Sequence, residues 1–314
     1  MTHSLASSPR LRSGLAGGLA VTSAFWLGAT SAEAQIAYGF DSTNTLYSFS
    51  VTNPTATTPV GNIGFTPEGI DFNPANGLLY AFNVGATNGE LYTLSLTTGT
   101  ATPVGTFPLS GGADATAYNL ANNSNFGFDF NPKTLQADGS IRIRLVSEDG
   151  DNIRLNSATG ALAAADTRLN GTSTSAVGAA YTNNFAQRFD LSPGPTSLFY
   201  VDAVANSLVL STNPNGGVTG TSTALGVDAQ LVTGFDIFTA ADGSSTGYLV
   251  TNADNIAGSE LYRIDTIGTS GATLVGNTGA VNLLDVAVTP VPEPATVSFL
   301  ALGLAGLLAR RRRS

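Results

Sequence analysis

Short segments in which apolar and polar residues alternate recur along the chain. Five of them, YSFSV, YTLSL, IRLNS, LVLST and YRIDT, occupy residues 47–51, 92–96, 153–157, 208–212 and 262–266. Alternation with a period of two is typical of a β-strand that buries one face. The pairs expected on that face are Tyr47 and Phe49, Tyr92 and Leu94, Ile153 and Leu155, Leu208 and Leu210, and Tyr262 and Ile264. The pattern predicts five equivalent strands.

A second type of segment precedes four of these strands. It reads EGIDF at 68–72, FGFDF at 126–130, VGAAY at 177–181 and TGFDI at 233–237. A fifth version, LLDVAV at 283–288, comes near the end and has no partner after it, whereas the first unit has no such segment before it. We therefore expect residues 283–288 to complete the first unit.

Two further types of segment fill the units. One is found at 78–82, 141–146, 198–202 and 247–251, and the other at 101–105 and 272–276. Four short strands in each unit of about 50 residues predict an all-β fold, a five-bladed β-propeller. Closure by a C-terminal strand leaves no open sheet edge. A two-sheet sandwich or a solenoid is the alternative, although a solenoid would not need the displaced last strand.

The repeats also resemble a known family. The segments that carry the likeness are FGFDFNPKTLQADGSIRIRLVSEDGDNIRLNSATGAL, GAAYTNNF, NSLVLSTNPNGG and ALGVDA, within a match over roughly residues 36–288. They are similar to an uncharacterised family of secreted bacterial domains of unknown function. That family brings no known activity, so the resemblance supports the propeller and leaves the function open.

The N-terminus has the organisation of a secretory signal peptide. Arg10 and Arg12 precede the apolar run LAGGLAVTSAFWLGA, and the small-x-small site of Ala32 and Ala34 follows. The apolar run is too short for a comfortable membrane span. We expect signal peptidase to remove residues 1–34 and leave Gln35 first.

The C-terminus combines a proline turn, an apolar segment and a basic cluster over residues 290–314. Pro292, Glu293 and Pro294 hold the junction extended. Residues 295–309 are apolar apart from two hydroxyls, which predicts a short transmembrane helix, and snorkelling of the flanking arginines lengthens its reach. The cluster that should stay cytoplasmic consists of Arg310, Arg311, Arg312 and Arg313. A plain membrane anchor is one interpretation.

The same order of parts resembles the PEP-CTERM sorting signal of Gram-negative bacteria. The resemblance implies that an exosortase-like membrane enzyme recognises the motif and releases or transfers the protein. It further implies a protein that is held transiently in the inner membrane and then reaches the cell surface or extracellular matrix, often in organisms that produce exopolysaccharide. Residues 35–289 would form the exported propeller domain.

Charge and composition limit the chemistry of that domain. Residues 35–289 contain no His, Cys, Trp or Met, and their 7 basic and 20 acidic residues give a net charge of −13. An acidic body repels phosphate backbones, so we expect no nucleic-acid partner. Catalysis by a nucleophile with histidine and zinc sites built on His or Cys are excluded. Carboxylate chemistry and oxygen-ligated metals remain.

Two groups of carboxylates are candidates for a site. Asp71, Asp129, Asp236 and Asp285 recur at one position of the repeat, where the fourth unit has Ala180. They could form a calcium-binding ring near the axis, but a side chain that bonds backbone amides once in each blade is the favoured interpretation.

Glu148, Asp149 and Asp151 form the densest acidic segment. They are weak calcium candidates, because the segment does not fit an EF-hand loop, and an acidic hairpin turn is the favoured alternative. We expect Arg142, Arg144 and Arg154 to pair with these carboxylates.

Residues 181–185, YTNNF, combine aromatic rings with amides, as sugar-binding sites do, although a strand that runs into its loop is the favoured interpretation. The absence of His and Cys favours a non-enzymatic binding or structural module with no required cofactor, and the resemblance of the tail to the PEP-CTERM signal implies extracellular polysaccharide as a candidate partner. The alternative is a carboxylate-dependent glycosidase or lyase on extracellular polysaccharide. An enzyme of that kind needs a cleft with two carboxylates in different environments.

Overall fold

The computed structural model describes Met1 and residues 35–184, 196–240, 242–252 and 257–290. The chain divides into two compact units, Met1–Glu33 and Ala34–Ser314, and the described fold belongs to the second. The predicted signal peptide, Phe185 and the tail from residue 291 onward lie outside the described residues. Within the described ranges, no helix is long and apolar enough to cross a membrane.

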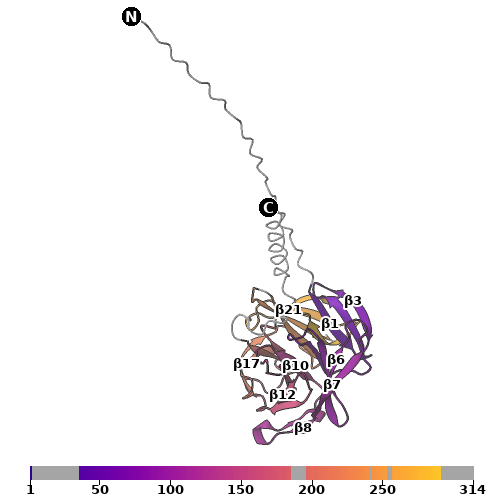
Figure 1. The fold of residues 1–314 in the computed structure, drawn as a ribbon, viewed down its shortest axis with the longest axis vertical. Helices are drawn as coiled ribbons and strands as arrows, with labels where there is room; N and C mark the ends of the chain where they lie inside the picture. The colour runs from indigo at the N-terminus through magenta and orange to yellow at the C-terminus, as the bar shows by residue number, and fades with distance from the viewer. Residues whose placement is uncertain (2–34, 185–195, 241, 253–256, 291–314) are drawn as a thin grey trace. The chain divides into compact units, whose positions relative to one another are not determined.

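Twenty strands form five blades of four antiparallel strands each, in the order from the inner to the outer strand (Figure 1). Blade 1 contains β23 (Leu283–Val288), β1 (Ile36–Asp41), β2 (Thr45–Ser50) and β3 (Asn53–Asn62). Blade 2 contains β4 (Gly69–Phe72), β5 (Leu79–Val84), β6 (Asn88–Leu94) and β7 (Ala101–Pro108). Blade 3 contains β10 (Phe126–Asn131), β11 (Arg142–Ser147), β12 (Asn152–Asn156) and β13 (Leu162–Ala165).

Blade 4 contains β15 (Gly178–Tyr181), β16 (Leu198–Asp202), β17 (Ser207–Asn213) and β18 (Val218–Ala224). A two-residue strand, β14 (Asn170–Gly171), adds to its outer edge in parallel with β18. Blade 5 contains β19 (Thr233–Thr239), β20 (Ser245–Thr251), β21 (Glu260–Ile264) and β22 (Thr273–Asn277). The linker between blades 2 and 3 carries the ribbon of β8 (Ser110–Gly111) and β9 (Tyr118–Asn119) and two short 3₁₀ turns, η1 (Asp114–Thr116) and η2 (Leu120–Asn122).

The inner strands form a closed ring, in which β23, β4, β10, β15 and β19 each pack beside the next and β19 packs beside β23. The prediction of an all-β propeller with five blades is confirmed. Each segment type of the sequence occupies one strand position in the blades. The alternating segments, for example, form the third strands β2, β6, β12, β17 and β21.

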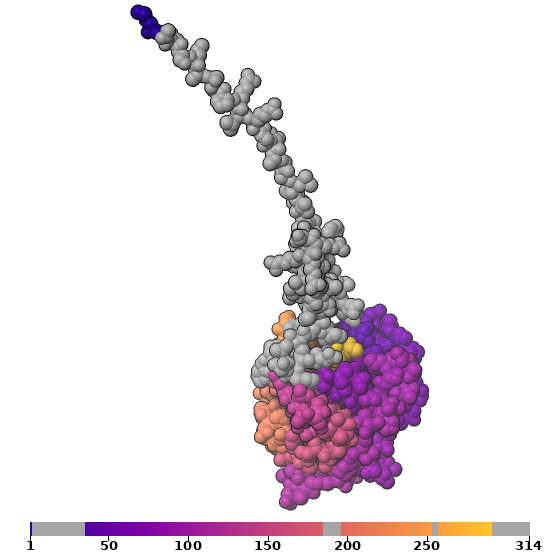
Figure 2. All heavy atoms as spheres, viewed as in Figure 1, coloured from indigo at the N-terminus to yellow at the C-terminus, as the bar shows by residue number. Residues whose placement is uncertain are grey.

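The C-terminal strand closes the first blade, as the sequence predicted. β23 pairs antiparallel with β1, with Val286 opposite Gly39. A side chain at Gly39 would bring a Cβ within 2.8 Å of the Asp285 carbonyl oxygen, so this position requires glycine. Figure 2 shows the yellow atoms of the C-terminal strand beside the indigo and purple atoms of the first blades.

The start of the fold coincides with the predicted cleavage point. The side-chain amide of Gln35 donates to Thr289 Oγ1 at 2.9 Å, and the N–H of Thr289 donates to the carbonyl of Ile36 at 2.9 Å. Residues immediately after the expected signal peptide are therefore tied to residues immediately before the proline turn.

The hydrophobic core consists of five clusters, and each fills the junction between two neighbouring blades. The junction of blades 2 and 3 has the largest cluster, which includes Ile153 and Leu155 and an aromatic group in which Phe82 stacks on Phe128. The junction of blades 3 and 4 has the fewest buried apolar residues of the five. Polar side chains supply much of the packing there.

Candidate functional site

The four repeated aspartates join neighbouring blades through backbone hydrogen bonds. Each lies on an inner strand, and each uses one carboxylate oxygen to accept the N–H of the next residue in its own strand. The other oxygen accepts an N–H from the inner strand of the following blade. These bonds run from Ile70 to Asp285 at 2.8 Å, from Phe130 to Asp71 at 3.2 Å, from Val288 to Asp236 at 2.6 Å, and from Tyr181 to Asp129.

Burial dominates the electrostatics of this ring. It raises the pKa of Asp129 and of Asp285 to about 7, and it raises the pKa of Asp71 and of Asp236 well above the usual range. The charge of Asp129 raises the pKa of Asp71 further. Within the described part of the chain, no three acidic side chains gather as metal ligands. Each aspartate therefore links its own inner strand to the inner strand of the next blade through two hydrogen bonds from backbone amides. We call this arrangement a clasp.

The junction of blades 4 and 5 lacks this clasp because Ala180 replaces the aspartate. Ala180 is fully buried in the apolar cluster of the junction. Two asparagines beyond the end of β15 make the cross-blade bonds instead. The N–H of Asn183 donates to Thr239 Oγ1 at 2.9 Å, the N–H of Thr239 donates to Asn184 Oδ1 at 3.1 Å, and the Asn184 amide donates to the carbonyl of Ile237.

The acidic segment occupies the hairpin turn between β11 and β12, and its carboxylates face different partners. Glu148 accepts the N–H of Ser124 at 2.9 Å and the amide of Asn125 at 2.5 Å. Asp151 is buried and pairs with Arg168 and the Asn123 amide. Asp149 is exposed.

The expectation that Arg142, Arg144 and Arg154 pair with this segment was wrong. Arg144 and Arg154 both bind Asp166, which follows β13. The Arg142 guanidinium donates to Gln136 at 3.1 Å. The side chains of Arg142, Arg144 and Arg154 do not reach the turn, whereas Arg168 in the following linker lies against it.

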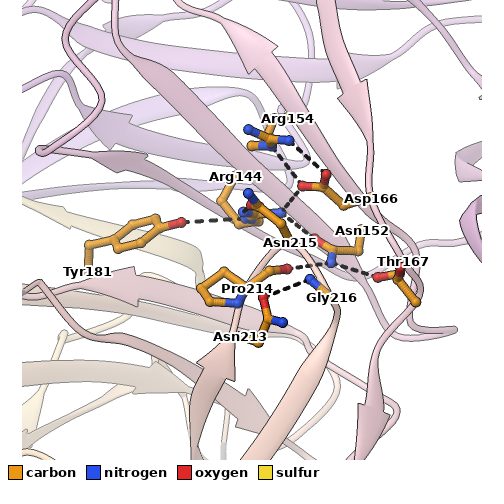
Figure 3. Close-up of polar contacts among 10 residues, drawn as sticks. All are labelled: Arg144, Asn152, Arg154, Asp166, Thr167, Tyr181, Asn213, Pro214, Asn215 and Gly216. Carbon is orange, nitrogen blue, oxygen red and sulfur yellow. Dashed lines mark hydrogen bonds and ion pairs between the residues drawn. The ribbon is translucent and has the colours of Figure 1, made fainter.

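A buried polar network around Arg144 fills the junction of blades 3 and 4 (Figure 3). Arg144 is 2% exposed, and its guanidinium donates to Asp166 and Asn152 at 2.6 Å and to Asn215 at 2.8 Å. The Asn152 amide in turn donates to two backbone carbonyls, those of Thr167 and Pro214. Because the buried charge is paired and its donors are bonded, these contacts offset the cost of desolvating the guanidinium, and the network joins the two blades.

The predicted aromatic and amide run divides between two places. Tyr181 is buried, and its hydroxyl accepts a hydrogen bond from Arg144 Nε at 3.4 Å in the network of Figure 3. Its ring is therefore not an open platform for a sugar. Asn183, two residues later, lines a groove between blades 4 and 5.

This groove has a volume of about 490 Å³ and lies where the first and third hairpins of blade 5 face blade 4. Its polar lining comes from hydroxyl, amide and carboxylate side chains, and its apolar lining from Phe199 and Ile267. The lining residues are Thr182, Asn183, Ser197, Phe199, Gly243, Ser244, Ser245, Asp265, Thr266 and Ile267. Asp265 is exposed and forms an ion pair with Arg263 at 2.6 Å.

Most residues of the groove were not identified from the sequence. Ser244, Asp265 and Thr266 lie in ordinary turns, and their local sequence carries no signal beyond a turn composition. They come together with Asn183 only because blades 4 and 5 are neighbours. The one available signal was Ala180, which marks this junction as different.

Comparison with protein families agrees with both resemblances seen in the sequence. A model described as a domain of unknown function (DUF4394) matches residues 45–287. A second model, the PEP-CTERM protein-sorting motif, matches residues 290–313. The motif marks an exported protein that an exosortase-like enzyme recognises and processes at the membrane.

No curated protein matches the chain. Among solved structures, a putative exo-β-1,3-galactanase from Bifidobacterium bifidum s17 is 12% identical, with a TM-score of 0.47 and coverage of 80% of this chain and 90% of the other. TolB from Acinetobacter baumannii is 13% identical, with a TM-score of 0.44 and coverage of 82% and 67%. A GH43 glycoside hydrolase is 12% identical, with a TM-score of 0.43, and the match covers 81% of this chain and 54% of the hydrolase, about half its length.

Proposed function

Since this chain belongs to the DUF4394 family of domains of unknown function and carries a PEP-CTERM motif, we propose that it is a cell-surface or matrix protein of a Gram-negative bacterium. Its propeller acts as a non-enzymatic module that binds extracellular polysaccharide. The signal peptide, residues 1–34, directs export, and exosortase-type processing removes the arginine tail.

The observation that carries the binding role is the groove between blades 4 and 5. Its volume of about 490 Å³ lies within the range of roughly 300–1,000 Å³ that is typical of small-molecule sites. Hydroxyl and amide groups in the lining suit the hydroxyls of a sugar, and Phe199 and Ile267 supply apolar lining for its C–H groups. Rings and amides of this kind recognise neutral carbohydrate without a metal or a cofactor.

The arrangement of carboxylates favours binding over hydrolysis. A glycosidase needs two carboxyl groups, one on each side of the scissile bond. Among the described residues that line the groove there is one carboxylate, Asp265, which is exposed and paired with Arg263. The aspartates of the ring are occupied by backbone amides. A glycosidase or lyase is the second candidate, and release of reducing ends from a bound polysaccharide would identify it.

A glycan array with the full chain, purified in detergent, tests the binding role. We expect binding to neutral polysaccharides, a loss of signal in Ser244→Trp, which blocks the groove, and a weaker signal in Asp265→Asn. Asp138→Asn is the matched control, because Asp138 is an exposed turn aspartate outside the groove. Equal signals from Ser244→Trp and the unaltered chain would exclude the groove.

Intact-mass analysis of the protein from its host tests the sorting role. We expect the surface-located protein to lack residues 1–34 and to lack Arg310, Arg311, Arg312 and Arg313. Retention of the four arginines in the surface-located protein would indicate a permanent anchor.

A further inference from the structure

A second cavity, of about 120 Å³, lies at the axial end of the propeller where the inner strands begin. All five blades contribute to its lining. Equivalent positions of four repeats, three residues before the ring position, supply Glu68, Phe126, Val177 and Thr233, and Leu284 comes from β23. The cavity is distinct from the groove between blades 4 and 5, with which it shares no lining residue.

Two neighbouring positions of the repeat behave differently at this cavity. One is glycine in all four repeats, and the other varies. The residue after each of these four positions is always glycine, and a Cβ on Gly127 or Gly234 would lie within 2.7 Å of backbone atoms in the next blade. The glycines therefore serve the packing of the inner ring. The position before them holds Glu68, Phe126, Val177 or Thr233, so one of these four blades presents a carboxyl there. Asp285 also lines the cavity, but its carboxyl oxygens already accept the N–H groups of Ile70 and Val286.

Glu68 is distinguished from the other glutamates of the propeller by its lack of a partner. Glu90 and Glu260 accept hydrogen bonds from tyrosine hydroxyls, at 2.7 Å and 2.5 Å, and Glu148 accepts two bonds from the 124–125 segment. No described residue bonds to or pairs with the half-buried carboxyl of Glu68. Burial raises its pKa, with no bond or cation to lower it. The cost of this desolvation falls when a ligand supplies the missing donor.

The other side of the cavity is apolar and open to solvent. Leu231 and Val232 are 49% and 40% exposed, although both are large aliphatic residues. In the part of the chain that the structure describes, no lysine and no arginine lines the cavity. The propeller domain as a whole carries a charge of −13, which raises the local concentration of cations.

The size of the cavity limits the ligand. A volume of about 120 Å³ is below the roughly 300 Å³ at which pockets for whole small molecules begin. It is close to the engineered cavity of about 150 Å³ that holds benzene. One side-chain-sized group fits, and a sugar ring with its hydration does not.

We propose that the axial cavity binds an alkylammonium group, whose nitrogen donates to the Glu68 carboxylate and whose methylene stem packs against Leu231 and Val232. Both a free amine and the lysine side chain of a partner protein present this chemistry. An ammonium replaces the missing partner of Glu68, and an aliphatic stem covers surface that is otherwise exposed to water.

Calorimetric titration of the full chain in detergent with butylammonium chloride tests the proposal. We expect saturable binding with one site. Tetramethylammonium, which has no N–H, and butanol, which has no charge, should bind at least about tenfold more weakly, because a charged hydrogen bond contributes roughly 1.5–3 kcal/mol. Nα-acetyl-lysine amide in place of butylammonium distinguishes a lysine side chain from a free amine, since the cavity must then admit the bulk around its backbone.

Two variants decide whether Glu68 is responsible. Glu68→Gln should bind butylammonium at least about tenfold more weakly, whereas Glu90→Gln should bind as the unaltered chain does, because Glu90 and its partners Tyr92 and Asn83 lie outside the cavity lining. Val232→Trp fills the mouth and should also abolish binding, and it serves as the second variant if Glu68→Gln fails to fold. Absence of saturable binding, or an equal loss in Glu90→Gln, would overturn the proposal.

Discussion

The junction between blades 4 and 5 differs from the other four junctions in how its inner strands are joined. At the other four, a buried aspartate accepts an N–H from each of two neighbouring strands. At blades 4 and 5, Ala180 packs in an apolar cluster and Asn184 makes the cross-blade bonds near the end of the strand. At a regular junction the bonding side chain is an aspartate within the inner strand, whereas at the exception it is Asn184, which lies beyond the end of β15 and next to Asn183 of the groove.

This difference separates two kinds of repeated position. A residue that recurs from blade to blade meets a structural requirement that the blades share. Here the requirement is a hydrogen-bond acceptor for the backbone amides of the inner strands. Where a residue departs from the repeat, either that acceptor is not required or another side chain supplies it. Ala180 is such a departure, and Glu68 lies at a position that differs from blade to blade. A groove lies next to the first and a cavity next to the second.

The largest effect should follow from breaking the ring itself. A chain that ends at Asn282 lacks β23, and with it both Asp285 and the amide of Val288 that Asp236 accepts. Two clasps are lost, the edge of β1 opens, and the cluster between blades 5 and 1 is uncovered. We expect loss of the cooperative unfolding transition, measured by circular dichroism during heating.

The control for this truncation is a chain that ends at Pro290. It also lacks the C-terminal tail but retains β23 and Thr289. It should melt in one transition like the full chain. If the chain that ends at Asn282 melts in the same way, the closed ring does not determine the stability of the fold.

A smaller effect should follow from removing one ring aspartate, either in blade 3 or in blade 5, on either side of blade 4 with its Ala180. In Asp129→Ala, the N–H of Phe130 keeps its bond to Asp71, and only the N–H of Tyr181 loses its partner. In Asp236→Ala, the amides of Ile237 and Val288 both lose their partners, because Ala180 supplies no second carboxylate. Each unpaired buried amide costs about 1–3 kcal/mol.

Asp236→Ala should therefore lower the free energy of unfolding by about twice as much as Asp129→Ala does. Denaturant unfolding of both variants measures the two losses. Equal losses would show that the Ile237 amide does not depend on Asp236 alone, although Ala180 replaces the aspartate of blade 4. This result would contradict the comparison between the junctions.

The positions of these aspartates could be predicted from the sequence, because a period of one aspartate per blade is visible without a structure. The closing strand at 283–288 could be predicted for the same reason. The partners of Arg144 could not, since Asp166 approaches only when β13 pairs with β12, and Asn215 approaches only when blade 4 packs on blade 3. The sequence separation between Asn183 and Asp265 hid the groove in the same way.

The buried carboxylates also predict the pH dependence of stability. The pKa of Asp129 and of Asp285 is raised to about 7 in the fold, against about 3.9 in the unfolded chain. The stabilisation from this shift is fully present below about pH 3.9 and is lost as the pH rises through about 7. We expect the melting temperature to be higher at pH 5 than at pH 8.

Repulsion between surface carboxylates would change stability in the same direction, so a control is needed. Salt screens surface charges but affects the buried ring much less. The difference between pH 5 and pH 8 should persist in 0.5 M NaCl and should become smaller in Asp129→Asn. A difference that disappears in salt would assign the effect to the surface.

The smallest expected effect concerns calcium at the turn that contains Glu148, Asp149 and Asp151. A cation bound only by the folded chain, at 100 times its dissociation constant, would add about 2.7 kcal/mol to the free energy of unfolding. We expect no such gain, because Arg168 already neutralises Asp151 and the Ser124 amide already bonds Glu148. Melting temperatures in CaCl₂ and in NaCl of matched ionic strength should be equal. Because Asp151→Asn loses the Arg168 ion pair in either salt, the quantity to compare is the difference between the two salts, measured for the unaltered chain and for Asp149→Asn with Asp151→Asn. A rise specific to calcium that disappears in the double variant would show that the turn, unlike the aspartate ring, exchanges its internal partners for a metal ion.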